Sequence, residues 1–230
     1  MRKRIRDFIL PRAQRNSLLR ALLPARSVLK FRAKIIIMEY KTLLGFLAVA
    51  IEIISYVIYF IGIFRGKTKP HAFTWFVWGV LNIVAFIAVL ISGGEFGSWI
   101  LGVNVLACFI IAIIGFIQKH VVYDKYDWLA LAGAFVGTFL WWMTENPLYA
   151  VVLVSIADGI GTIPIFRKAY RAPFEENITA FAIGVLYYPL AILALESLTL
   201  TTWLYPAVVF LLDAALVILI FTQRKKLKNI

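Results

Sequence analysis

Long apolar runs separated by short polar or charged segments make up most of the chain. Each run has about 17–22 residues, the length that an α-helix needs to cross the hydrocarbon core of a bilayer. The runs are apolar on all sides and show no amphipathic periodicity, so we expect lipid rather than water to surround them. This pattern predicts an all-α membrane protein with seven transmembrane helices, at residues 43–64, 73–92, 97–117, 126–143, 147–166, 177–196 and 201–222.

An internal repeat organises these predicted helices. The tripeptide Ile-Phe-Arg at 63–65 opens a basic loop that contains Pro70, and the same tripeptide at 165–167 opens a second basic loop that contains Pro173. Each copy follows one apolar run and precedes two more, and a single run separates the two groups. We therefore expect two parallel three-helix repeats joined by one linker helix. The expected segments are a basic extension (1–42), the first repeat (43–117), a loop with the linker helix (118–146), the second repeat (147–222) and a basic tail (223–230).

Composition supports a membrane protein and narrows its chemistry. Of the 230 residues, 62% are hydrophobic and only 16% are charged, which is too little polar surface to cover a soluble domain of this size. The single cysteine, Cys108, excludes an internal disulfide and a multi-thiolate metal site, and we expect it to pack in the interior. No nucleophile–base pair, phosphate loop or helical His-Glu motif is present, and His71 and His120 stand apart. We therefore expect no enzyme activity, no metal site and no cofactor.

The charges of the predicted loops indicate an orientation. The loops on one side, together with the C-terminal tail, carry twelve Lys and Arg residues, whereas the other loops carry only Glu95, Glu145 and Glu196 as charged residues. By the positive-inside rule the basic loops are cytoplasmic. Seven crossings then place the start of the first helix outside and the C-terminus in the cytoplasm, in a plasma or inner membrane. The twelve basic residues are Arg65, Lys67, Lys69, Lys119, Lys125, Arg167, Lys168, Arg171, Arg224, Lys225, Lys226 and Lys228.

The first 37 residues carry most of the net charge of +12. They hold eleven basic residues and one acid, whereas the rest of the chain holds thirteen basic and eleven acidic residues. A segment this basic resists export, which conflicts with an outside N-terminus. We favour the hypothesis that residues 1–37 are a dispensable extension or a mispredicted start, with Met38 as the alternative start. An Arg-rich organelle transit peptide, or an interfacial amphipathic helix interrupted by Pro11 and Pro24, is the open alternative. No recognition motif accompanies the charge, so nucleic acid is not an expected partner.

The layout of three, one and three helices, with parallel repeats and a cytoplasmic C-terminus, resembles the SWEET and PQ-loop transporter superfamily over residues 43–222. The nicotinamide riboside transporters share this layout. PQ-loop proteins carry a Pro-Gln pair near the cytoplasmic end of the first helix of each repeat. Here Pro164 is followed by Ile165, and the first repeat has Gly62 and Ile63, so the glutamine is missing from both copies. The resemblance implies a divergent SWEET-like transporter with its cargo bound between the repeats, and it leaves a homo-oligomer open.

Three acidic residues lie inside predicted helices: Glu52 in the first, Asp158 in the fifth and Asp213 in the seventh. An ionisable side chain in the hydrocarbon region costs about 3 kcal/mol on insertion scales, so it usually faces a cavity or a partner. No Lys or Arg lies at a comparable depth. We therefore expect these carboxyl groups to be protonated, hydrated, or matched to a cation or a sugar-like polyol. Glu52 is also near enough to the outer end of its helix to snorkel.

Asn82 and Asn104 are neutral candidates, in the second and third predicted helices. In SWEET-like proteins an asparagine in the third helix of a repeat commonly contacts cargo, and Asn104 and Asp213 lie in the third helices of the two repeats. Interhelical hydrogen bonding is an equally open role for both asparagines. We expect Asn82, Asn104, Asp158 and Asp213 to bind the solute, and Glu52, Asp158 and Asp213 to be the candidates for proton coupling.

Prolines and aromatic residues complete the prediction. Pro164, Pro189 and Pro206 each lie within a predicted helix, where proline removes a backbone hydrogen bond and favours a kink, so we expect hinges there. The tyrosines at 187–188 are candidates for lining a cavity or for simple packing. Trp75 and the other tryptophans near predicted helix ends are expected to anchor the chain at the membrane interface.

Together these features predict an integral membrane transporter that carries a small polar solute by alternating access, with proton coupling left open. The expected partners are this solute and the lipid bilayer. The alternative is a non-transporting scaffold or assembly protein with a SWEET-like fold. That alternative predicts acidic residues that face lipid or are plugged by side chains, with no cavity between the helices.

Overall fold

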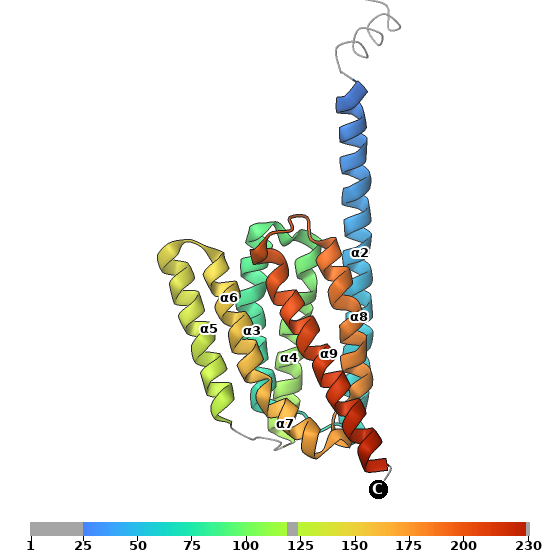
Figure 1. The fold of residues 1–230 in the computed structure, drawn as a ribbon, viewed down its shortest axis with the longest axis vertical. Coiled ribbons are helices and arrows are strands. Elements are labelled where there is room, and N and C mark those ends of the chain that lie inside the picture. Colours follow the sequence, from blue (N-terminus) through green and yellow to red (C-terminus); the bar gives the residue numbers. More distant parts are fainter. Residues whose placement is uncertain (1–24, 119–123, 229–230) are drawn as a thin grey trace, which may run out of the picture. The chain divides into compact units, whose positions relative to one another are not determined.

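The computed structural model describes residues 25–118 and 124–228, and within these ranges the chain is helical and contains no strand (Figure 1). The predicted all-α class is therefore confirmed. Each predicted apolar run falls on a helix, and the fifth run is divided between two. The main helices are α2 (Ala25–Phe64), α3 (Ala72–Val89), α4 (Trp99–Ile117), α5 (Lys125–Thr144), α6 (Pro147–Gly161), α7 (Ile163–Arg171), α8 (Ile178–Ala194) and α9 (Leu200–Lys228).

The chain separates into two compact units, Met1–Tyr40 and Lys41–Ile230. In the described part of the first unit, α2 begins at Ala25, and the side chains of residues 36–40 are exposed. The predictions for residues 1–24 lie outside the described residues. Everything that follows concerns the second unit.

Four helical stretches of the described chain are long and apolar enough to cross a membrane, and α8 is a shorter apolar helix. These lengths and compositions indicate a membrane protein, as the apolar runs predict. The four stretches are Ile36–Phe64, Ala72–Ile117, Pro147–Arg171 and Leu200–Leu227.

The second of these stretches contains a chain reversal. After α3 comes a π-helical turn, η2 (Leu90–Gly94), and then a 3₁₀ turn, η3 (Glu95–Ser98). Gly93 has φ of 86°, a left-handed conformation that glycine adopts without the steric penalty of a Cβ atom. The helical path therefore breaks at Gly93, and α4 begins as a separate helix.

α3 and α4 pack against each other in antiparallel directions. A Cβ atom added to Gly79 would lie 2.9 Å from the Phe109 ring, and one added to Gly115 would lie 2.8 Å from Ala72. From the first contact to the second, the residue number in α3 falls from 79 to 72 while that in α4 rises from 109 to 115. This opposite order is the signature of an antiparallel pair. Glycine allows this close approach because it has no side chain.

α6 and α7 form a broken helix within one apolar run. α6 ends at Gly161 and α7 begins at Ile163, with Pro164 in its first turn. Proline suits this position because the amide hydrogen that it lacks would have no intrahelical acceptor there. The Thr162 hydroxyl donates to the carbonyl oxygen of Asp158 at 2.7 Å, within the last turn of α6. Pro164 therefore lies at the start of a helix, beside a break in the helical path.

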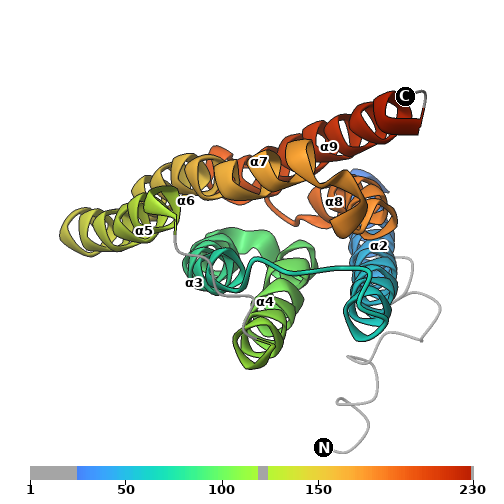
Figure 2. The same ribbon diagram turned by 90° about the horizontal axis from the view of Figure 1, so that it is seen from below.

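α6 lies in the middle of the second unit, where it packs against α5, α3 and α9. Figure 2 shows α5, α6 and α9 following one another in a row, with α3 and α4 on one side of it. α8 packs against α9 and is hydrogen-bonded to α2. The Ser55 hydroxyl donates to the carbonyl oxygen of Ala180 at 2.8 Å, and the Asn177 side chain donates to that of Ile58 at 3.0 Å. These contacts show that α2 and α8 are antiparallel neighbours.

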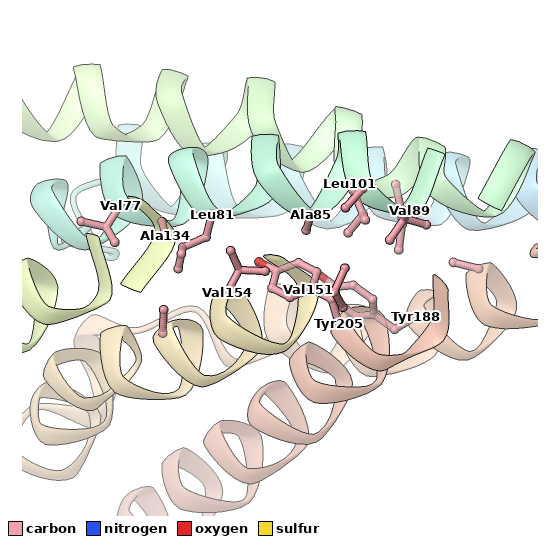
Figure 3. Packing of buried hydrophobic residues seen from close by; sticks show 14 of the residues in the cluster. Val77, Leu81, Ala85, Val89, Leu101, Ala134, Val151, Val154, Tyr188 and Tyr205 are labelled. Atoms are coloured by element: carbon pink, nitrogen blue, oxygen red, sulfur yellow. The ribbon is translucent and has the colours of Figure 1, made fainter. Parts of the chain in front are cut away.

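Two hydrophobic clusters hold the helices together. The first joins α3, α6, α8 and α9 (Figure 3) and includes Val77, Leu81, Ala85, Val151, Val154, Tyr188 and Tyr205. The second lies toward the basic loops and includes Tyr59, Trp75, Ile111, Ile165, Leu216 and Ile220. Both clusters contain residues from the first and the second half of the chain, so the two halves share one interior.

Candidate functional site

A pocket lies between α2, α3, α4, α6, α8 and α9. Its walls contain all four residues that the sequence predicts as solute-binding: Asn82, Asn104, Asp158 and Asp213. These residues come from four different helices. The fold therefore brings them to one site, where a single small ligand can contact several of them.

Asp158 and Asp213 are the acidic residues of the pocket. Asp158 is 4% exposed, and the Asp213 carboxylate lies beside Gly184 of α8 in the wall of the same pocket. Neither carboxylate has a hydrogen-bond or ion-pair partner among the described residues. No lysine, arginine or histidine lines the pocket. The two acids thus line one pocket in which no protein cation balances them.

Glu52 is the third predicted acid, and it does not line the pocket. Its side chain is 0% exposed, and neither carboxylate oxygen has a hydrogen-bond partner. The snorkelling alternative for Glu52 is therefore wrong, because the side chain points into the protein. It lies one helical turn before Tyr56, which does line the pocket. Glu52 is buried on the pocket-facing side of α2 without reaching the pocket surface.

The two asparagines differ in their contacts. Asn104 joins two other helices, since its side-chain oxygen accepts from the Tyr56 hydroxyl and its side-chain nitrogen donates to the Tyr188 hydroxyl at 3.1 Å. Asn82 donates to the carbonyl oxygen of Trp78 in its own helix at 2.9 Å. The side-chain oxygen of Asn82 is buried without a hydrogen-bond partner.

Aromatic side chains form much of the remaining wall. The rings of Trp75 and Trp78 meet edge to face at 5.1 Å, and the Tyr59 ring lies 5.0 Å from Trp75. Trp75 is only 4% exposed, so the prediction that it anchors the chain at the membrane interface is wrong. The signal for its real place is the spacing of Trp75, Trp78 and Asn82, which puts the three on one face of a helix. The tyrosines at 187–188 also line the pocket.

Two of the predicted hinge prolines follow pocket tyrosines directly. Pro189 lies inside α8 after Tyr188, and Pro206 lies inside α9 after Tyr205. Each removes a backbone hydrogen bond at the level of the pocket.

At the end of the bundle that carries Glu95 and Glu196, loops from the two halves of the chain are bonded to each other. The backbone nitrogen of Ser197 donates to the carbonyl oxygen of Gly93 at 3.0 Å. A Cβ atom on Gly97 would lie 2.6 Å from the carbonyl oxygen of Ala191, so only glycine fits there. These contacts hold the two halves of the chain together at this end of the bundle.

The opposite end, formed by the basic loops, carries a second set of contacts between the two halves of the chain. Lys168 forms an ion pair with Glu176 at 2.6 Å, and the Lys69 backbone nitrogen donates to the carbonyl oxygen of Glu175 at 3.2 Å. Burial raises the pKa of Glu176, whereas the Lys168 ammonium opposes this shift. Lys69 and Glu175 also form a more exposed ion pair. The loop after α2 and the loop after α7 are thus held together.

Among the described residues, no group of three His, Cys, Asp or Glu side chains is placed to hold a metal ion. Cys108 lines the pocket and is free and buried. The chain matches no family model, and no curated protein and no solved structure is significantly similar to it.

Proposed function

We propose that this protein carries a small polar solute across a membrane by alternating access, with the pocket as the solute site. The observation that carries the proposal is that two carboxylates without an ion-pair partner, those of Asp158 and Asp213, line a pocket whose walls come from both halves of the chain. Buried acids without a counter-charge are costly inside a membrane protein. Such a cost is understandable where a ligand or a proton neutralises them during a transport cycle.

The proposal includes two parallel three-helix repeats, with α5 as the extra crossing between them. The first repeat is α2–α4, and the second is α6–α9, in which α6 and α7 count as one broken helix. Two packing relations support it. In the proposed repeats, α6 corresponds to α2 and α8 corresponds to α3. The second helix of the first repeat, α3, packs against α6, and the second helix of the other repeat, α8, is hydrogen-bonded to α2, so the two contacts are equivalent. α3 with α4 and α8 with α9 form corresponding pairs. Tyr56 and Asp158, both in the pocket, lie 102 residues apart, as do the two Ile-Phe-Arg tripeptides.

In this proposal, the contacts at the two ends of the bundle act as the gates that alternating access requires. Opening the end at Gly93 and Ser197 exposes the pocket to one side, and separating Lys168 from Glu176 exposes it to the other. By the positive-inside rule we place the basic end in the cytoplasm. The prolines beside Tyr188 and Tyr205 are positioned to let α8 and α9 bend at pocket level.

Proton coupling forms part of the proposal, with Asp158 and Asp213 as the groups that exchange the proton and Glu52 as an assisting group. A carboxyl that is neutral in the empty pocket and ionised with bound cargo links proton movement to solute movement. Coupling of this kind needs no metal ion or cofactor.

The test is uptake by proteoliposomes containing the purified full-length protein, across a panel of radiolabelled polyols, amines and amino acids, with and without a pH gradient. We expect uptake of at least one solute, and we expect Asp158→Asn and Asp213→Asn to abolish it while folding is retained. Glu196→Gln, an acid exposed at the loop end, is the matched control and should transport normally. Unchanged flux in both pocket variants refutes the site, and no uptake of any solute favours the scaffold alternative.

A further inference from the structure

The pocket's charge and its aromatic walls indicate a class of solute. We propose that the solute is a small organic cation with apolar substituents on its nitrogen, of the quaternary-ammonium type. This inference rests on the transport function proposed above and specifies the ligand of the same site.

The first argument is the sign of the charge. Asp158 and Asp213 face the pocket, and no basic side chain lines it. The neighbouring lysines are engaged at the two ends of the bundle, where Lys41 donates to the carbonyl oxygen of Leu195 at 2.7 Å and Lys168 pairs with Glu176. An anion would lack a counter-charge in this pocket, and the carboxylate of an amino acid would meet two like charges. A monocation instead balances one of the acids.

The second argument is the surface that surrounds these acids. Eight of the twenty lining residues are aromatic. Tyr59, Trp75 and Trp78 stand in edge-to-face or tilted contact in one part of the wall, and Tyr187 and Tyr188 lie 4.6 Å apart in another. Aromatic faces attract cations, and cages of several rings are the usual receptors of quaternary ammonium groups. Methyl groups on the nitrogen fit such walls because they are apolar and carry part of the positive charge.

The third argument excludes the competing ligands. A bare metal ion needs several oxygen ligands, and the described residues contain no cluster of three acidic, His or Cys side chains. A sugar needs many free polar groups, but Tyr56, Asn104 and Tyr188 already bond to one another. Among the described residues of the wall, five buried polar atoms have no hydrogen-bond partner: the Asn82 oxygen, the indole nitrogens of Trp75 and Trp78, and the hydroxyls of Tyr59 and Tyr205. Each is enclosed by neighbouring atoms, so the acids and the aromatic rings are the main contacts left for a ligand.

The experiment compares choline with 3,3-dimethyl-1-butanol, its neutral isostere, by quenching of tryptophan fluorescence in the purified full-length protein. We expect saturable binding of choline at least about tenfold tighter than that of the isostere, since the charge is their only difference. Asp213→Asn and Trp78→Leu should each weaken choline binding about tenfold or more. Trp142→Leu is the matched control, because Trp142 is 75% exposed and absent from the pocket. Size-exclusion profiles and unfolding temperatures establish that each variant is folded.

Equal affinity for choline and its isostere refutes the cationic class, as does displacement of choline by a neutral sugar. Absence of choline binding also refutes it, and Asp-dependent uptake of another solute in proteoliposomes then leaves the proposed function standing. Conversely, charge-dependent choline binding without any flux supports this inference and refutes transport. Choline binding that survives in Asp213→Asn and Trp78→Leu places the ligand elsewhere and overturns the assignment to this pocket.

Discussion

Replacing Gly184 with alanine tests whether the Asp213 carboxylate must keep its position in the pocket. A Cβ atom at Gly184 would lie 2.6 Å from Oδ2 of Asp213, whereas ordinary van der Waals contact begins at 3.4 Å. The carboxylate therefore has to move by the difference, about 0.8 Å. α8 and α9 are packed against each other, so rotation of the Asp213 side chain is the easiest response.

The expected effect follows from this rotation. Holding a side chain about 30° from its preferred rotamer costs about 0.5–1.5 kcal/mol. If ligand binding requires the original position, affinity for an organic cation falls about two- to twelvefold. Stability should change little, since alanine in a helix interior is favoured over glycine by about 0.5–1 kcal/mol, which offsets the strain.

Gly159→Ala is the matched control for this substitution. Gly159 lies in α6 beside Asp158, and a Cβ atom there would meet nothing within 4 Å, so it gains helix propensity without displacing a carboxylate. Choline titrations and thermal unfolding of both variants in one detergent give the comparison. Wild-type affinity in Gly184→Ala, or an equal loss in Gly159→Ala, would refute the reasoning.

Three further predictions concern stability. Leu81→Ala, at a side chain that is 0% exposed, should lower the unfolding free energy by about 0.3–2.6 kcal/mol. The same substitution costs about 2.7–5.0 kcal/mol in soluble cores, and about 2.4 kcal/mol of that is water-to-core transfer energy, which is not lost in a lipid surrounding. Leu106→Ala, at a 66% exposed side chain, should cost less than about 0.5 kcal/mol, and equal losses would contradict the packing. Asn177→Ala should lower the unfolding free energy by about 1–3 kcal/mol, because Asn177 caps α8 and also bonds to α2. Asn146→Ala removes only a helix cap and should cost less, and unfolding titrations of the two variants test this difference. Burial, aided by the Lys168 charge, lowers the pKa of His71, so its contribution to stability is present above the ordinary value of 6.5 and is lost as pH falls through the lowered pKa. The wild type should then lose more stability than His71→Gln on acidification through this range, and parallel pH profiles would refute this.

Most of the helices of the second unit follow from the sequence alone. Apolar runs of membrane-spanning length leave the backbone no stable alternative to helix in lipid, and the observed helices coincide with the predicted runs. The break between α6 and α7 was signalled by Pro164, and the reversal after α3 lies between the predicted helices that end at 92 and begin at 97. The candidate acids were also identifiable, because charge inside an apolar run is costly whatever the fold.

The direction in which each side chain points could not be predicted in the same way. In a soluble protein, polar residues mark the outer face of a helix, but in a membrane both the lipid-facing and the buried faces are apolar. For this reason Trp75 was expected at the interface and lies in the pocket, and the alternative that Glu52 snorkels toward the outer end of its helix was left open although its side chain is fully buried.

The sequence by itself therefore determined that this is a membrane protein, where its helices run, and which residues carry unusual charge. Only the tertiary structure decided that Asp158 and Asp213 line one pocket while Glu52 does not. The physical reason is that helix formation depends on local hydrogen bonding and hydropathy along the chain. A pocket depends instead on the packing of helices distant in sequence, and that packing is set by shape, through glycines, aromatic rings and a few interhelical hydrogen bonds.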